Sequence, residues 1–251
     1  MPAPYLASMN RSFSALAALS LAALTLAGCQ KADDAAFGQR VRAYLLQHPE
    51  VIREAALKLN ENDKLAAAKA ATESMTKYRA QLERDPRDFV ANPDGKITVV
   101  EFFDYRCGYC KVAAPEVMKL IAENPDVRFV FKEFPIFGEV SDTTAKIALT
   151  PQGKAKGLNL YSAWMGEKAL DEAAVDRHLT GVGLDPAAVR KAASDPAIDR
   201  QILDTRALAS ALKIDGTPAF IVGNTIIPGA DMAALRAAIT QAKAGDLKKL
   251  S

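Results

Sequence analysis

Two cysteines, Cys107 and Cys110, stand three positions apart in the sequence Cys-Gly-Tyr-Cys. Cysteines at this spacing can close a small disulfide ring, and a helix N-terminus stabilises the thiolate of the first one through its dipole and free amide groups. The β-branched and aromatic run 97–103 predicts a buried strand before the motif, and residues 112–122 have the apolar spacing of a helix after it. We therefore expect Cys107 at a helix start as the nucleophile that forms mixed disulfides, with Cys110 one turn deeper to resolve them.

Other uses of a cysteine pair fit the neighbouring residues less well. A c-type haem site needs a histidine directly after the second cysteine, where this chain has Lys111. A structural zinc site needs four ligands, and Cys29, His48 and His178 are not at ligand spacing. A purely structural bridge over so short a loop adds little stability. We expect no metal and no cofactor besides the Cys107–Cys110 disulfide, with Cu(I) held by the two thiolates as an alternative.

The N-terminal residues have the pattern of an export signal. Arg11 supplies positive charge, residues 13–26 are apolar, and small residues precede Cys29. Residues 26–29, Leu-Ala-Gly-Cys, resemble the bacterial lipobox, which implies a lipoprotein signal peptide at 1–28 and acylation of Cys29. Gln30 then implies sorting to the outer membrane, so we expect a lipid-anchored protein of the oxidising periplasm. The start codon, Met1 or Met9, stays open.

Composition and charge exclude several classes of partner. The 251 residues are 49% hydrophobic and 25% charged, as in ordinary globular proteins, and the formal net charge is +2. Charges of both signs are interspersed, so no basic face predicts nucleic-acid binding.

The segment before the redox motif is predicted to be helical. Residues 37–85 indicate two helices, interrupted near His48-Pro49 and again at residues 60–62. In the second helix, a weak coiled-coil seam recurs at alternating spacings of three and four; its members are Leu65, Ala68, Thr72, Met75, Arg79 and Leu82. This seam fits either self-association or packing on the same chain. We predict a tether and helical oligomerisation arm at 29–90 and a second domain at 91–251.

The second domain has the element order of an α/β protein. Residues 127–131 predict a further strand, and 139–213 form a helical insertion in which cap residues precede the first turns; the caps are Thr150, Asp171, Asp185 and Asp195. Residues 219–222 and 225–227 predict a hairpin turned at Gly223-Asn224, and Asp231 caps a final helix.

Three segments in this order resemble the DsbA-like thioredoxin family, and the nearest branch resembles the ScsC-type proteins, which carry an N-terminal helical arm. The segments are Glu-Phe-Phe-Asp-Tyr-Arg-Cys-Gly-Tyr-Cys at 101–110, Phe-Lys-Glu-Phe-Pro at 131–135 and Gly-Thr-Pro-Ala-Phe at 216–220. The similarity covers about residues 37–245. It implies a thioredoxin fold with an inserted helical subdomain, preceded by an N-terminal helical oligomerisation arm.

The resemblance also implies roles for single residues. Pro218 matches a cis-proline facing the dithiol, and Thr217 beside it offers backbone groups to a substrate; Gly108 and Tyr109 complete the expected substrate-binding residues. Glu101 matches a buried acid that moves the proton of Cys110, although an exposed charge on an edge strand is the alternative. Lys132 is expected either beside Glu101 or in solvent at a strand end.

The residues around the cysteines favour one activity over another. Strongly oxidising DsbA proteins carry Pro-His between the cysteines and valine before the cis-proline, whereas this chain has Gly108-Tyr109 and Thr217, as DsbC-like isomerases and ScsC do. The resulting hypothesis is a periplasmic disulfide isomerase or reductase, with a DsbA-type dithiol oxidase as the alternative. A lipid-anchored copper-binding chaperone or surface binding protein is the alternative from another class. The implied partners are misoxidised exported proteins, a DsbD-like membrane reductant or DsbB-like oxidant, and further copies of this chain.

Overall fold

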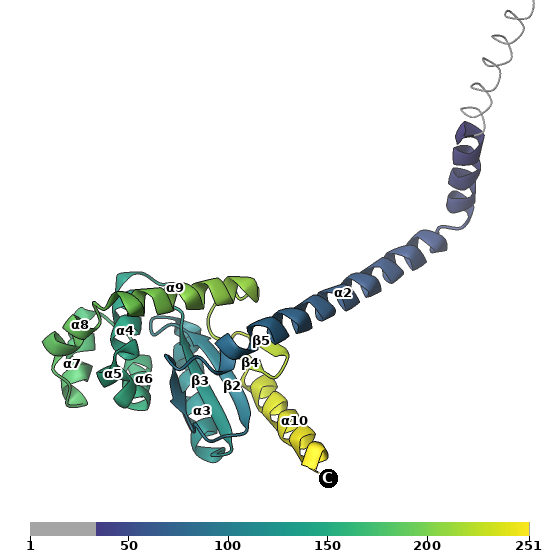
Figure 1. Cartoon of the computed structure of the whole chain (residues 1–251). Coiled ribbons are helices and arrows are strands. Elements are labelled where there is room, and N and C mark those ends of the chain that lie inside the picture. Colours follow the sequence, from purple (N-terminus) through teal and green to yellow (C-terminus); the bar gives the residue numbers. More distant parts are fainter. Residues whose placement is uncertain (1–33, 251) are drawn as a thin grey trace, which may run out of the picture. The chain divides into compact units, whose positions relative to one another are not determined.

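The computed structural model describes residues 34–250. The predicted signal peptide, 1–28, and the predicted lipidation residue Cys29 lie outside the described residues. The chain divides into two compact units, Met1–Ala67 and Ala68–Ser251. Figure 1 labels the elements. Among residues 34–250, no helix is both long and apolar enough to cross a membrane.

The described part of the first unit is helical. One helix covers residues 34–47, and α2 (Glu50–Glu83) begins directly after Pro49. The break at His48-Pro49 is therefore confirmed, and it follows from the missing N–H of proline. The second predicted break, at residues 60–62, is wrong because α2 continues through it. Asn and Glu lower helix propensity only modestly compared with Gly or Pro, and Lys58 donates to Glu61 at 2.8 Å on this stretch.

The second unit is built on a five-stranded sheet. Its strands are β1 (Phe89–Ala91), β2 (Ile97–Phe103), β3 (Val127–Glu133), β4 (Ala219–Val222) and β5 (Thr225–Pro228). They lie in the order β1-β3-β2-β4-β5, with β2 and β3 parallel and the other pairs antiparallel. The predicted β4–β5 hairpin is confirmed, and Gly223 in its turn has φ 59°, a conformation that glycine adopts readily.

Helices account for the rest of the second unit. The redox helix α3 (Gly108–Glu123) joins β2 to β3, and α10 (Met232–Leu250) follows the hairpin. The insertion contains α4 (Glu139–Leu149), α5 (Pro151–Ala155), α6 (Gly157–Gly166), α7 (Glu172–Gly181), α8 (Pro186–Ala192) and α9 (Pro196–Ala211). The four predicted cap side chains accept hydrogen bonds from backbone N–H groups at the starts of α5, α7, α8 and α9. The predicted α/β fold class with a helical insertion is thus confirmed.

The two faces of the sheet are covered by different helices. Val99, Phe103 and Phe131 belong to one apolar cluster, which also contains residues of α3, α6 and α10. Val100 and Phe102 belong to a second cluster, which contains residues of α9 and the last turns of α2. Because side chains alternate along a strand, a sheet covered on both faces buries every residue of its central strand. All seven residues of β2 are buried accordingly.

The two halves of the predicted coiled-coil seam of α2 lie in different environments. Met75 and Leu82 are each only 1% exposed and pack in the second cluster against the sheet, whereas Leu65 is 63% exposed. The sheet-containing unit begins at Ala68, earlier than the predicted boundary at residue 91. The reason is that it includes the end of α2 as well as β1, which pairs with β3. Packing on the same chain therefore explains the C-terminal half of the seam.

The last turns of α2 are also held by hydrogen bonds. Arg79 donates to the carbonyl oxygen of Gly223 and to the side chain of Asn224, both in the β4–β5 turn. The carbonyl oxygens of Gln81 and Glu83 accept from side chains of β3, Lys132 and Arg128. Cations near the C-terminus of a helix also complement its dipole. The end of α2 is thus fixed to strands at both sides of β2.

Lys132 forms a buried ion pair with Asp88, so both predicted positions for it are wrong. The two side chains are each 2% exposed, and their charged atoms lie 2.5 Å apart. In the sheet register Lys132 is paired with Phe102, while Glu101 is paired with Phe131. Lys132 and Glu101 therefore point to opposite faces of the sheet. Burial raises the pKa of Asp88 to about 6, and Lys132 opposes this shift.

The first prediction concerns this ion pair. Substituting Lys132→Ala leaves a carboxylate buried without its cation, so the free energy of unfolding at pH 7 should fall by about 3 kcal/mol. The loss should be smaller below pH 6, where Asp88 takes up a proton. Urea unfolding measures both values. The matched control is Lys146→Ala, which removes the exposed ion pair with Asp199 and should cost less than about 1 kcal/mol. Equal losses in the two variants would contradict the prediction.

Candidate active site

Cys107 and Cys110 lie at the junction between β2 and α3. Cys107 is the N-cap residue of α3, with extended backbone angles (φ −69°, ψ 121°), and its sulfur accepts a hydrogen bond from the N–H of Cys110 at 3.4 Å. Both cysteines are free and buried, with 3% and 0% of their surface exposed. Tyr109 between them is 71% exposed, and Gly108 is exposed as well. The structure thus places Cys107 at a helix N-terminus, as the sequence predicts.

The two sulfurs have opposite proton affinities. The pKa of Cys107 is lowered to about 5, first by a hydrogen bond from the Cys110 side chain and further by Thr217 and backbone N–H groups, against a raising effect of burial. The pKa of Cys110 is raised, first by burial and then by its hydrogen bond to Cys107. Because the thiolate is the reactive form of cysteine, Cys107 is ionised and nucleophilic at neutral pH, while Cys110 keeps its proton.

Thr217 and Pro218 lie directly against the Cys107 sulfur. The peptide bond between them is cis, as the family resemblance implies. The Cys107 sulfur lies 3.2 Å from the Thr217 carbonyl oxygen, and it donates a hydrogen bond there only in its protonated, thiol form. The Thr217 hydroxyl oxygen is buried and has no hydrogen-bond partner among the described residues. Thr217 is 110 positions from Cys107 in the sequence, and the fold brings it and Pro218 into the same site.

Glu101 is a buried acid on the central strand of the sheet, not an exposed charge on an edge strand. It is 2% exposed, and the Tyr161 hydroxyl donates to its two carboxyl oxygens at 3.0 and 3.2 Å. Burial raises its pKa to about 8, which the Tyr161 hydrogen bond partly offsets. The charge of Glu101 also contributes to the raised pKa of Cys110. A carboxyl group with a pKa near neutrality can take up and release a proton during turnover.

Sequence reasoning missed a second buried acid and the tyrosines of this region. Glu133 at the end of β3 is 5% exposed and accepts a hydrogen bond from the Tyr105 hydroxyl at 2.9 Å. Burial raises its pKa well above the ordinary value. Tyr105 and Tyr161 belong to an aromatic group with Phe103. The available signal was a pair of charged residues, Lys132 and Glu133, inside an otherwise apolar segment, Phe131 to Pro135.

Asp104 is another residue that the sequence analysis left without a role. It is 1% exposed and lies between the end of β2 and Cys107. Its backbone oxygen accepts a hydrogen bond from the Cys107 N–H at 3.1 Å. Its side chain accepts hydrogen bonds from the redox loop and from a second loop at residues 134–138. An acidic residue directly after a buried strand was the signal for it.

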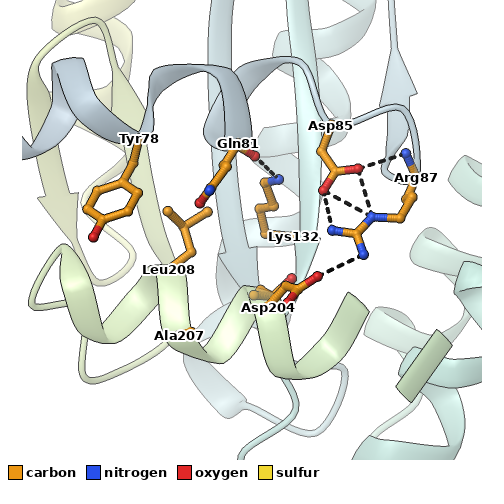
Figure 2. A pocket seen from close by; sticks show the side chains of 9 residues that line it. Tyr78, Gln81, Asp85, Arg87, Lys132, Asp204, Ala207 and Leu208 are labelled. Atoms are coloured by element: carbon orange, nitrogen blue, oxygen red, sulfur yellow. Dashed lines mark hydrogen bonds and ion pairs between the residues drawn. The ribbon is translucent and has the colours of Figure 1, made fainter. Parts of the chain in front are cut away.

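The cavity in Figure 2 lies apart from the dithiol. It has a volume of about 360 Å³ and is lined by the end of α2, the residues after it, β3 and α9. Figure 2 shows Lys132 bonded to the backbone of Gln81 and Arg87 joined to Asp85 and Asp204. Arg87 is thus paired with two acids of the cavity and Lys132 with Asp88 outside it, and none of the lining residues is a predicted site residue. The redox site remains the candidate active site.

Comparison with known protein families supports the fold. The model described as the DSBA-like thioredoxin domain matches residues 98–240. The model described as the copper resistance protein ScsC N-terminal domain matches residues 33–66. The first match includes the whole Cys107 to Cys110 motif and Pro218.

Solved structures resemble most of the chain. BcfH of Salmonella enterica Typhimurium is 33% identical, with a TM-score of 0.65, over 89% of this chain and 99% of that one. Proteus mirabilis ScsC in a transitional conformation is 29% identical, with a TM-score of 0.63, over 84% of this chain and 99% of that one.

The curated relatives match over shorter stretches. The Na(+)/H(+) antiporter NhaA 1 of Salinispora arenicola is 30% identical over 169 residues, which are 64% of this chain and 26% of that protein. This chain thus spans about a quarter of the length of that relative. The thiol:disulfide interchange protein DsbA of Bordetella pertussis is 31% identical over 136 residues, 51% of this chain and 64% of that protein. The matched residues, the fold and the dithiol agree, and this chain belongs to the DsbA-like thioredoxin-domain family, with an N-terminal segment of the ScsC type.

Proposed function

We propose that the chain is a periplasmic thiol-disulfide oxidoreductase that acts on exported proteins, chiefly as a disulfide isomerase or reductase. The observation that carries this proposal is the pairing of an ionised Cys107 with a protonated, buried Cys110 beside Thr217 and Pro218. Such an arrangement gives the two sulfurs different roles: Cys107 attacks the substrate and Cys110 resolves the mixed disulfide. Relatives support the compartment, since one solved neighbour is a periplasmic thioredoxin-like protein of Salmonella enterica serovar Typhimurium.

The first step is attack of the Cys107 thiolate on one sulfur of a substrate disulfide. A bond forms between Cys107 and that sulfur, the substrate disulfide breaks, and the other substrate sulfur leaves as a thiolate. In isomerisation this thiolate attacks another disulfide of the substrate. A substrate thiolate then displaces Cys107 from the mixed disulfide. Cys107 returns as a thiolate, so the substrate is rearranged with no net transfer of electrons.

The reductase branch uses Cys110. Cys110 loses its proton and attacks the Cys107 sulfur, which releases the substrate as a dithiol and leaves a Cys107–Cys110 disulfide. The two electrons lost by the cysteine pair are gained by the substrate. Glu101 is the group that we assign to receive the Cys110 proton, since it is buried, its charge acts on Cys110 and its pKa is about 8. A membrane thiol reductant of the DsbD type then returns the pair to the dithiol state.

A dithiol oxidase is the second candidate, and the pKa of Cys107 is the observation that favours it. A stabilised thiolate favours the reduced protein and so makes its disulfide more oxidising. The value of about 5 lies between about 7 for thioredoxin and about 3.5 for DsbA, both of which are reference values. We favour the isomerase because Gly108 and Tyr109 place no cationic ring beside Cys107. The oxidase would need a DsbB-like partner.

The N-terminal unit is proposed as an oligomerisation arm. Large apolar side chains are exposed along its described helices; they include Phe37, Tyr44, Ile52, Leu57, Leu59 and Leu65. Exposed apolar surface on this scale is typical of segments that associate with another chain. The match of residues 33–66 to the ScsC N-terminal domain supports the same role. A lipid anchor at Cys29 would hold the oligomer at the outer membrane.

The second prediction concerns the ionisation of Cys107. In the reduced wild-type protein, the rate of alkylation by iodoacetamide should rise with pH around a midpoint of about 5. Cys110→Ala removes the hydrogen bond that contributes most to this low pKa, so the midpoint should move upward by about 1 unit. Tyr109→Phe, which changes only an exposed side chain, is the control. A wild-type midpoint near the ordinary thiol value of about 8.5 would contradict the assignment of Cys107 as the nucleophile.

The third prediction concerns Glu101. Its carboxylate form is populated above pH 8, so the rate at which Cys110 resolves a mixed disulfide should increase as pH rises through about 8. Glu101→Gln keeps an acceptor for Tyr161 but cannot take up the proton, and the inflection should disappear. Rapid-mixing measurements of substrate release test this. The same inflection in the variant would exclude Glu101 as the proton acceptor.

A stability measurement on Glu101→Gln provides a separate check. The folded protein keeps the Glu101 proton to about pH 8, whereas the unfolded chain loses it near the ordinary value. The folded state therefore binds more protons in this window, and the wild type loses stability as pH rises through it. Urea unfolding should show that the free energy of unfolding of Glu101→Gln, relative to that of the wild type, increases between pH 5 and pH 8 by on the order of 2 kcal/mol.

The fourth prediction tests the isomerase and the arm together. The wild-type protein should restore activity to scrambled ribonuclease, and a variant lacking residues 34–67 should lose this activity and show a smaller mass by light scattering. The deletion stops at residue 67 because the sheet-containing unit begins at Ala68. Oxidation of reduced ribonuclease should persist in the variant. Failure of the wild type with scrambled ribonuclease, together with rapid oxidation of the reduced form, would favour the oxidase.

A further inference from the structure

The Asp104 carboxylate joins two loops and a helix. One oxygen, Oδ1, accepts hydrogen bonds from the Arg106 N–H at 2.7 Å and from the Ser141 hydroxyl in α4 at 2.8 Å. The other oxygen, Oδ2, accepts from the N–H groups of Ile136 and Phe137, at 2.7 and 3.1 Å. Four hydrogen bonds thus converge on one buried side chain, and hydrogen bonds that are shielded from water are stronger than exposed ones.

The loop at residues 134–138 is held along its backbone by further bonds. The Phe134 N–H donates to the Phe103 carbonyl oxygen at 3.0 Å. Side chains fix two of the loop's carbonyl oxygens: Arg206 donates to that of Pro135 at 2.9 Å, and Arg106 to that of Phe137 at 2.9 Å. Together with the bonds to Asp104, these contacts fix consecutive peptide groups of the loop. Its backbone is thus rigid although the loop lies at the surface.

Two side chains of this loop are apolar and face solvent. Ile136 is 42% exposed and Phe137 is 48% exposed. Apolar side chains that need no ordering on contact make efficient anchors, because little conformational entropy is lost when they bind. Hydrogen bonds with Asp104 and Arg106 also connect the loop to the segment that leads directly to Cys107. Because β2 and β3 are parallel, this loop and the redox loop leave the sheet at the same edge, and Arg106, the residue before Cys107, donates to the Phe137 carbonyl oxygen.

We propose that Asp104 is a positioning residue that locks the Ile136–Phe137 loop to the redox loop, and that these two side chains bind an apolar segment of the polypeptide held on Cys107. The inference rests on the proposed function and adds to it a class of substrate: polypeptides with apolar residues close to the reacting cysteine. Asp104 itself makes no contact with the reacting sulfurs through its side chain. It acts through the loop.

The experiment compares two disulfide substrates. One is a glutathionylated peptide with apolar residues next to its cysteine, and the other is oxidised glutathione, which offers no apolar segment. With each, the Cys107 thiolate attacks a sulfur, a mixed disulfide forms, and the displaced thiolate leaves. Phe137→Ser should raise KM for the apolar peptide at least about 5-fold, given the free energy of burying an aromatic side chain. Its rate with oxidised glutathione should stay within about 2-fold of the wild type.

Asp104→Asn tests the positioning role. An amide nitrogen cannot accept the hydrogen bonds that one carboxylate oxygen receives, so two donors lose their acceptor. KM for the apolar peptide should rise as in Phe137→Ser, with the rate for oxidised glutathione again within about 2-fold. Hydrogen exchange at the Ile136 and Phe137 amides should become at least about 10-fold faster.

Two matched controls accompany these variants. Leu203→Ser removes an apolar side chain on α9 that is 60% exposed and should leave KM unchanged for both substrates. Ser141→Ala removes one hydrogen bond to Asp104 while keeping both loop N–H bonds, and it should likewise leave KM unchanged.

Several outcomes would overturn the inference. An unchanged KM for the apolar peptide in Phe137→Ser would exclude binding at this loop. If Asp104→Asn slowed the reactions with both substrates equally, Asp104 would act on the dithiol and not on the loop. Fast exchange of the Ile136 and Phe137 amides in the wild type would exclude a locked loop, and this measurement does not require that Asp104→Asn fold. A wild-type protein that reacts with neither substrate would overturn the proposed function and this inference with it.

Discussion

The burial of β2 on both faces is the constraint on which the rest of the structure depends. A strand in the middle of a covered sheet must send alternate side chains to opposite sides. The side that carries Val99 and Phe103 also carries Glu101, and it faces α3, the helix that begins at the dithiol. The other side carries Phe102 beside Lys132. The same alternation therefore places Glu101 on the face of α3 and the buried cation Lys132 on the opposite face.

This separation explains how two kinds of buried charge coexist in one small sheet. Lys132 and Asp88 neutralise each other on one face. On the other face Glu101 has a tyrosine partner and, among residues 34–250, no cation bonded to it. A carboxyl group in that environment is held in its neutral form at pH values where an exposed one would be ionised. The fold thus costs stability at Glu101, whose charged form is disfavoured by burial, and preserves it at Lys132 by pairing.

Local sequence signals predict local structure well in this chain. The apolar run 97–103, the cysteine spacing and the cap residues before α5, α7, α8 and α9 each act within a few positions, and the structure has those elements. The cis bond before Pro218 was implied only by the family resemblance. By contrast, the partner of Lys132 depends on strand register and on a residue 44 positions away, which no local pattern encodes.

The remaining errors have the same physical origin. The seam on α2 predicts an apolar stripe correctly, but periodicity does not identify the surface against which the stripe packs. Met75 and Leu82 lie on the sheet, while Leu65 is exposed. Asp104 and Glu133 were missed because a single acidic residue next to an apolar run has no periodicity, and its meaning appears only with its hydrogen-bond donors in place.

The bonds from Arg79 to the β4–β5 turn have a mechanical consequence. β4 begins directly after Pro218, pairs with β2 along its length and reaches the turn at Gly223, where Arg79 of α2 holds it. A strand paired along both edges and braced at its far end resists displacement along its axis. A pull on the Cys107 sulfur would therefore be resisted by the sheet and by the end of α2, and Pro218 would stay beside that sulfur.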